Sequence, residues 1–243
     1  MIQVVRRSIV DVYSQYSFNR QSLAYGSQGK LYHLHNARFE PGKFGQAVLV
    51  EEGTTNVANQ IFSSPSNRLF SFVSAYGGDA TVSYDANATN PIAGRTGAEK
   101  AVSTNGGQIM FYEAATGLTA LTENTSSIFV KGSGQVRWVH HQVDNGTGGA
   151  ISKSGPWITL TDSYQRISLT SKLATGYTSQ SILLQLSAGT TVWYDALQYE
   201  KQKSYPTSFV DGTRSPETLT IPTAGVLNPQ EGTVECWVYV PEF

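Results

Sequence analysis

The chain has 243 residues, which suits one large β domain or two modest ones and is long enough to bury a core. Only 14% of the residues are charged, where about 25% is typical, and the chain holds 23 glycines, so a helix-rich protein is not expected. The formal net charge of −1 leaves no basic field to neutralise phosphates, so nucleic acid is not expected as a partner.

The first segment, residues 1–56, opens with a Tyr- and Gln-rich stretch that lacks the apolar run of a signal peptide, so export by the usual signal is not expected. No run of about 18 apolar residues occurs in the chain, and membrane insertion is not expected either. The segment then reads NARFEPGKFGQAVLVEEGTTN, in which AVLVEE predicts a short strand after a Pro-Gly turn. We interpret residues 1–56 as an anchor followed by a strand segment.

The middle segment, residues 57–203, alternates apolar and polar residues in short runs that are separated by Gly, Asn, Asp and Ser. Short strands at a spacing of roughly ten residues, with Gly-rich turns, predict an antiparallel two-sheet sandwich. The strands predicted most clearly are Ser126–Lys131, Gln135–Val143, Trp157–Thr161, Gln165–Thr170, Ser181–Ser187 and Thr191–Glu200.

The last segment, residues 204–243, contains LTIP and TVECWVYV, which predict two strands joined by a Gly-Val-Leu-Asn-Pro turn. The second of them ends three residues before the end of the sequence, with apolar side chains that still need a partner. We therefore expect either a fragment of a longer protein or a strand that another chain completes.

Carboxylates and nucleophiles do not form a clear catalytic pattern. Acid/base hydrolysis of glycans needs two converging carboxylates, and each candidate lies beside turn residues or at a strand edge, where a solvated carboxylate is the ordinary interpretation. No G-x-S-x-G, P-loop, G-x-G-x-x-G or H-E-x-x-H pattern occurs. The sequence therefore predicts a protein that is not an enzyme. The carboxylates considered are Glu113, Glu123, Asp144, Asp162 and Asp195.

The strand QVRWVHHQV places Trp138, His140 and Gln142 on one face and Arg137, Val139 and Val143 on the other. An aromatic ring flanked by polar groups is what a sugar needs, because its C–H face stacks on the ring while its hydroxyls need partners. We predict a carbohydrate-binding row of Trp138, His140 and Gln142, with Tyr112 as a neighbour; the alternative is that Trp138 belongs to the core. Core packing is predicted for the other tryptophans, Trp157, Trp193 and Trp237.

The stretch Ile61–Lys201 resembles the jelly-roll carbohydrate-binding modules of the four/nine type, through SIFVK, the segment WITLTDSYQR and the closing strand VWYDALQYE. The longer closing phrase VWYDALQYEKQKSYPTSFVDGTR looks like the version in bacteriophage tail and fibre proteins, and the flanking phrases are similar to laminin-G or concanavalin-like domains. The resemblance implies an all-β fold: an antiparallel jelly-roll β-sandwich at 57–203, carried between 1–56 and a truncated laminin-G-like start at 204–243.

The same resemblance implies a phage virion component, in a tail, baseplate or head fibre, assembled in bacterial cytoplasm and attached to host cell-surface polysaccharide and other virion proteins. Many such proteins are homo-oligomers, often trimers. The alternatives are a carbohydrate-binding region of a secreted polysaccharide-degrading enzyme, and a capsid decoration or structural spacer without sugar affinity. No cofactor is expected beyond a structural calcium, which the resemblance implies at Asp195, although the segment after Asn59 offers no equivalent of the family's second acidic ligand.

Overall fold

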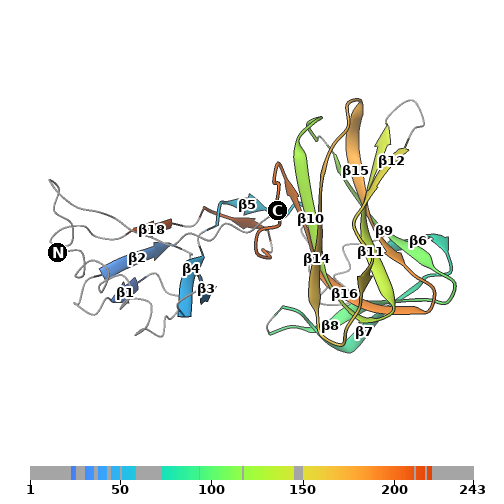
Figure 1. Cartoon of the computed structure of the whole chain (residues 1–243), viewed down its shortest axis with the longest axis horizontal. Helices are drawn as coiled ribbons and strands as arrows, with labels where there is room; N and C mark the ends of the chain where they lie inside the picture. Colours follow the sequence, from blue (N-terminus) through green and yellow to red (C-terminus); the bar gives the residue numbers. More distant parts are fainter. Residues whose placement is uncertain are drawn as a thin grey trace. The chain divides into compact units, whose positions relative to one another are not determined.

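The computed structural model divides the chain into two compact units, one of residues Thr55–Thr213 and one that combines residues 1–54 with residues 214–243. It describes residues 23–25, 31–35, 38–42, 45–49, 51–58, 73–92, 94–116, 118–144, 150–210, 212–216 and 218–220. Every regular element in these ranges is a β-strand (Figure 1). Within them there is accordingly no helix that could cross a membrane.

The larger unit consists of two facing antiparallel sheets (Figure 1). One has five strands in the order β14-β10-β16-β8-β7, which are Gln165–Lys172, Glu123–Ser133, Thr190–Lys201, Thr96–Ser103 and Thr81–Thr89. The other has the order β12-β11-β15-β9-β6, which are Ala150–Ser154, Gln135–Asp144, Tyr177–Leu186, Gly107–Thr116 and Val73–Gly78, with β13 (Ile158–Thr159) paired to β11. This arrangement confirms the predicted jelly-roll β-sandwich.

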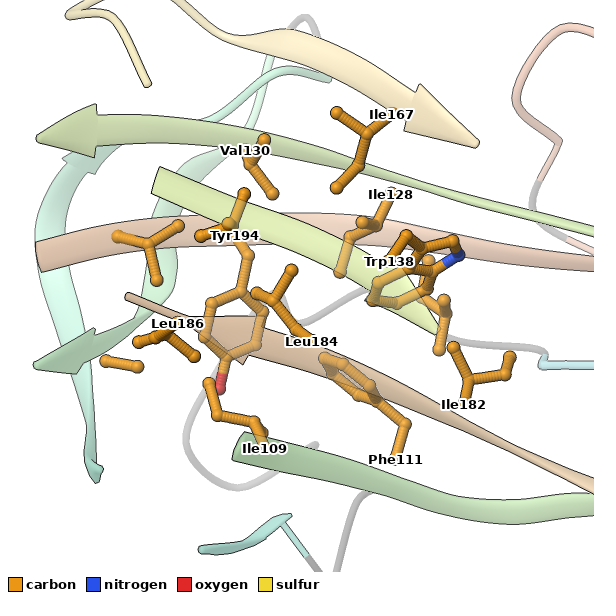
Figure 2. Close-up of a cluster of buried hydrophobic side chains, with 14 of the residues drawn as sticks. Ile109, Phe111, Ile128, Val130, Trp138, Ile167, Ile182, Leu184, Leu186 and Tyr194 are labelled. Carbon is orange, nitrogen blue, oxygen red and sulfur yellow. The ribbon is translucent and has the colours of Figure 1, made fainter. Parts of the chain in front are cut away.

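Apolar side chains from both sheets fill the space between them (Figure 2). Alternate residues of a strand point to opposite faces, so the inner rows of β10, β11, β15 and β16 meet in one layer. Phe111 lies at its centre, with its ring centroid 5.5 Å from that of Trp138 and 5.6 Å from that of Tyr194. Burial of such large side chains is the main source of stability for a sandwich of this size.

Strand β16 keeps its apolar residues inside by means of a bulge. Its sequence places Tyr194 and Leu197 three residues apart, and strict alternation would point them to opposite faces. The pairing with β10 shifts between Ser127 and Phe129, and Ala196 adopts a positive φ of 55°. The extra residue restores the inward direction, so both Tyr194 and Leu197 are buried.

The smaller unit has a three-stranded sheet in the order β1-β2-β18 and a hairpin of β3 and β4. The chain passes between the units at β5 and β17, which pair with each other. Arg214 and Glu51 form an ion pair of 3.0 Å. The predicted Tyr-rich anchor, the strand TVECWVYV and Trp237 lie outside the described residues. The bounds are Leu23–Tyr25 (β1), Leu31–His35 (β2), Arg38–Gly42 (β3), Gly45–Leu49 (β4), Thr54–Thr55 (β5), Thr213–Arg214 (β17) and Thr218–Thr220 (β18).

The strands predicted for the middle segment are all present, with one marked change of length. The expected strand Trp157–Thr161 is reduced to the two residues of β13, and Trp157 lies in the connection before it. Pro156 explains the late start, because proline has no N–H to donate to a ladder.

Candidate functional site

The predicted carbohydrate-binding row of β11 faces the interior. Trp138 is 2% exposed, His140 0% and Gln142 3%, so all three lie between the sheets. The prediction of a carbohydrate-binding row is therefore wrong, because the face of β11 that carries Trp138 points into the core, and the alternative of a core position for Trp138 is confirmed. Tyr112 lies on β9, and its side chain is outside the described part of the structure.

The interior row is held by hydrogen bonds that cross the sandwich. Trp138 Nε1 donates to Ser126 Oγ at 2.7 Å, and the same oxygen is 2.5 Å from His140 Nε2. His140 Nδ1 is 2.6 Å from Ser171 Oγ, which also accepts a bond from Gln180 Nε2 at 2.8 Å. Each buried polar group thus has a partner, as burial requires. We therefore assign this row to structure.

The His140 ring has a serine partner at each of its two nitrogens. A neutral imidazole donates from one nitrogen and accepts at the other, and a serine hydroxyl can serve either nitrogen because it has one donor and two acceptor sites. Burial lowers the pKa of His140 to about 3, and the positive charge of Lys153 acts in the same direction.

Gln142 fastens β11 to the turn that follows β14. Its Nε2 donates to the Lys172 carbonyl at 2.8 Å, and its Oε1 accepts from the Ala174 amide at 2.9 Å. Both ends of the amide are therefore used within the protein. A sugar hydroxyl would have to replace one of these bonds.

Asp195, at which the resemblance implies a calcium, is a buried residue of β16. Its carboxylate accepts hydrogen bonds from the Asn90 side chain and, at 2.6 Å, from the Ala196 amide, so it fixes the bulge of β16. In the described ranges, no three His, Cys, Asp or Glu side chains are grouped as metal ligands. The calcium at Asp195 stays a prediction.

The opposite face of β11 carries what we call the outer row, made of Arg137, Val139 and His141. Val139 pairs with Leu183, which pairs with Met110, and these three residues form a small buried cluster on this side of the sheet, 1%, 2% and 4% exposed respectively. On either side of this apolar cluster the face is polar. Gln185 pairs with Arg137 and Ser181 with His141, and His141 Nδ1 is hydrogen-bonded to Ser152 Oγ at 2.8 Å.

Trp157 lies beside the outer row and is 43% exposed. Among the large apolar residues that are exposed in the described part of the chain, it is the aromatic one. The Arg137 guanidinium carbon lies over its ring, 4.8 Å from the centroid. Arg137 is fixed in turn, because its Nε donates to Gln185 Oε1. We name this group of Trp157, Arg137 and Gln185 the tryptophan platform.

The prediction of core packing for Trp157 is therefore wrong. The Arg137 guanidinium supports the ring from one side and is itself held by Gln185, while the residue remains 43% exposed, an arrangement that suits an aromatic surface for a ligand. The sequence did contain a signal for this exposure. Gly155 and Pro156 come directly before Trp157 and indicate a loop rather than the interior of a strand.

A second aromatic group lies on the outer face of the five-stranded sheet. Lys100 Nζ lies 4.8 Å from the Trp193 ring centroid, and Lys131 Nζ lies 4.7 Å from that of Tyr164. Trp193 is half-buried rather than part of the core, and its Nε1 donates to Asp85 at 2.9 Å, a bond that lowers the pKa of Asp85. The end of β7 also reaches this group, since Tyr164 donates to the Thr89 carbonyl at 2.8 Å.

These contacts occupy the polar atoms of the second group with protein partners. Its cations face carboxylates and aromatic rings of the same sheet, and its tryptophan is less exposed than Trp157. The tryptophan platform is therefore the better candidate for contact with a ligand.

Comparisons with known proteins give similarities at the level of structure. No family model matches the sequence. No curated protein matches it either. Among solved structures, the enzymatically active domain of tailspike protein 4 from bacteriophage CBA120 aligns with 60% of this chain at 14% identity and a TM-score of 0.48. The chain spans 21% of that structure's length.

Two further similar structures contain carbohydrate-binding modules. One is a Clostridium thermocellum endo-1,4-β-D-xylanase with its CBM22-1 and GH10 modules, aligned over 65% of this chain and 29% of its own at 13% identity and a TM-score of 0.42. The other is described as carbohydrate-binding modules from the β-sandwich superfamily, aligned over 78% of this chain and 82% of its own at 13% identity and a TM-score of 0.45.

Proposed function

We propose that this chain is a non-catalytic glycan-binding protein whose β-sandwich contacts a polysaccharide through the tryptophan platform. The observation that carries the proposal is the exposed ring of Trp157, held by Arg137, which Gln185 holds in turn. An indole stacks on the C–H face of a pyranose, and amide and hydroxyl groups nearby satisfy the sugar hydroxyls. The outer face offers Gln185 Nε2 and His141 Nε2 for this purpose, since only the other polar atom of each side chain is bonded within the described residues.

The absence of catalysis is part of the proposal. Glycoside hydrolysis needs two carboxylates about 5 Å apart or somewhat more, with one kept protonated. Asp195 is buried and bonded to Asn90 and the Ala196 amide, and Glu123 lies 3.9 Å from Lys172. These are structural roles. The experiment is an assay for new reducing ends after incubation with a bound polysaccharide; their release would overturn this part.

We extend the proposal to the protein's setting: a phage virion component, assembled in bacterial cytoplasm as a homo-oligomer, that attaches to host cell-surface polysaccharide. The support is the order of the sequence phrases at 191–214, which resemble the closing segment of modules in phage tail and fibre proteins. The alternative setting is a binding region of a secreted polysaccharide-degrading enzyme. Mass spectrometry of purified virions distinguishes the two, since only a virion component copurifies with the particles.

The binding test compares Trp157→Ala with the unchanged chain in a pull-down on polysaccharides. We expect a loss of at least tenfold in affinity, because stacking on an exposed tryptophan is the central contact. Leu121→Ala is the matched control, since Leu121 is exposed at 66% and lies in the β9–β10 connection. Equal binding by the Trp157→Ala variant, or an equal loss in both variants, would overturn the proposed site. An unchanged chain that binds no polysaccharide would favour the structural-spacer alternative.

A further inference from the structure

We propose that the tryptophan platform selects glycans that carry carboxylate groups, with Arg137 as the residue that recognises the carboxylate. This inference rests on the proposed glycan-binding function and names its ligand class. The first observation is the geometry of the Arg137 guanidinium group. The Nε end of Arg137 donates to Gln185 Oε1, and the group lies over the ring of Trp157. Its two Nη nitrogens form no hydrogen bond within the described residues.

The positive charge of Arg137 is not neutralised by a described residue. No carboxylate in the described part of the chain forms an ion pair with Arg137, and its neighbours in register across the sheet, Gln185 and Gln108, are neutral. Arg214 shows the contrasting arrangement, because it is paired with Glu51 at 3.0 Å. A half-buried cation has lost part of its hydration, so an arriving anion gains more from it than from a fully exposed one.

The shape of the group selects the kind of anion. A guanidinium presents parallel N–H donors that match the two oxygens of a carboxylate, and the bond pair is charge-assisted. Gln185 and Trp157 hold the plane of the fork in advance, so little side-chain entropy is lost when the ligand binds. Because Arg137 covers one face of the Trp157 ring, a uronic or sialic acid residue would stack on the other face, and its carboxylate would reach the Nη nitrogens past the edge of the indole.

The experiment uses the full chain and measures its affinity for acidic polysaccharides beside neutral ones. The probes are polygalacturonate, hyaluronan and polysialic acid, each compared with its carboxyl-reduced form, which keeps the backbone and loses the charge. We expect binding to at least one acidic probe, about tenfold to a hundredfold weaker after reduction. It should also weaken as salt is added, because a partly exposed ion pair is screened.

Substitutions test whether Arg137 accounts for the preference for glycans that carry carboxylates. Arg137→Gln should lose the preference for the acidic probe, Arg137→Lys should keep part of it, and Trp157→Ala should weaken binding to both forms. Lys172→Gln is the control, because it removes the same charge from the other sheet; it should bind normally. Thermal unfolding confirms that each variant is folded.

The results separate the proposed carboxylate preference from the glycan-binding function on which it rests. A chain that binds only neutral glycans, or binds the reduced probe equally well, overturns the carboxylate preference and leaves the glycan-binding function in place. A loss in Lys172→Gln equal to that in Arg137→Gln also overturns it, since general charge would then account for the attraction. A chain that binds none of these polysaccharides overturns both.

Discussion

The two faces of β11 use similar residue types for opposite purposes. The inner row combines a tryptophan and a histidine with an amide, and every polar atom that it carries is bonded across the sandwich. The outer row combines an arginine and a histidine with a valine, and its arginine supports an exposed tryptophan from another segment. An aromatic residue flanked by polar ones therefore does not identify a binding surface by itself. What distinguishes the two faces is that every polar side-chain atom of the inner row has a partner within the fold, whereas on the outer row the two Nη nitrogens of Arg137 form no hydrogen bond within the described residues.

The largest expected difference between the faces concerns their two tryptophans. Trp138→Ala should lower the free energy of unfolding by about 3–5 kcal/mol, because it leaves a cavity beside Phe111 and removes the donor to Ser126. Trp157→Ala should lower it by about 1 kcal/mol or less, since its ring is 43% exposed. Urea unfolding of both variants measures the comparison. Similar losses would contradict the separation into a structural face and a binding face.

His140 of the inner row should make the free energy of unfolding depend on pH. The pKa of His140 is about 3 in the folded protein and about 6.5 when unfolded, so the unfolded state binds more protons between these values. Stability from His140 is complete above pH 6.5 and falls by about 1.4 kcal/mol per pH unit as the pH drops towards 3.

This pH dependence is isolated by comparing variants. His140→Gln removes the titrating group, so its unfolding free energy should fall less steeply between pH 6.5 and pH 4 than that of the unchanged chain. If His140→Gln retained the full slope, the neutral, bonded state assigned to His140 would be wrong.

The smallest expected effect on the free energy of unfolding concerns the bulge of β16, which keeps Tyr194 and Leu197 on the inner face. Ala196 has a positive φ of 55°, which costs a residue with a Cβ about 1 kcal/mol relative to glycine. Ala196→Gly should therefore raise the free energy of unfolding by about 0.5–1 kcal/mol. Ala101→Gly in β8 is the control, because Ala101 is buried in an ordinary strand and its replacement should destabilise. A loss of stability in Ala196→Gly would contradict the strain that we assign to the bulge.

Much of the fold follows from the sequence because alternation and glycine turns are local signals. They predict β10, β11, β14, β15 and β16 within a few residues of their observed ends. They miss β7, whose residues TVSYDANAT are mostly polar and half-buried or exposed, so little contrast marks its two faces. The bulge of β16 is visible in the sequence as an odd spacing between Tyr194 and Leu197, although the pattern alone does not place the extra residue.

The direction of the rows on β11 was less predictable. Alternation assigns Trp138 and His140 to one face but does not say which face is buried. The decision comes from Ser126 and Ser171, which lie on other strands and supply the hydrogen bonds that let these side chains be buried. The tryptophan platform depends in the same way on contacts remote in sequence, since Gln185 is 48 positions from Arg137. Such partners are brought together only by the tertiary fold.

The interior hydrogen-bond network also affects how easily one sheet of the sandwich can slide over the other. Its five hydrogen bonds, among Trp138, Ser126, His140, Ser171, Gln180 and Tyr199, all join one sheet to the other. Apolar contacts resist the separation of two layers but have little preference for their sliding position, whereas hydrogen bonds are directional. The network therefore acts against shear between the sheets. A force on Trp157 directed parallel to the sheets would be transmitted through β11 to these hydrogen bonds, and the five-stranded sheet would resist it.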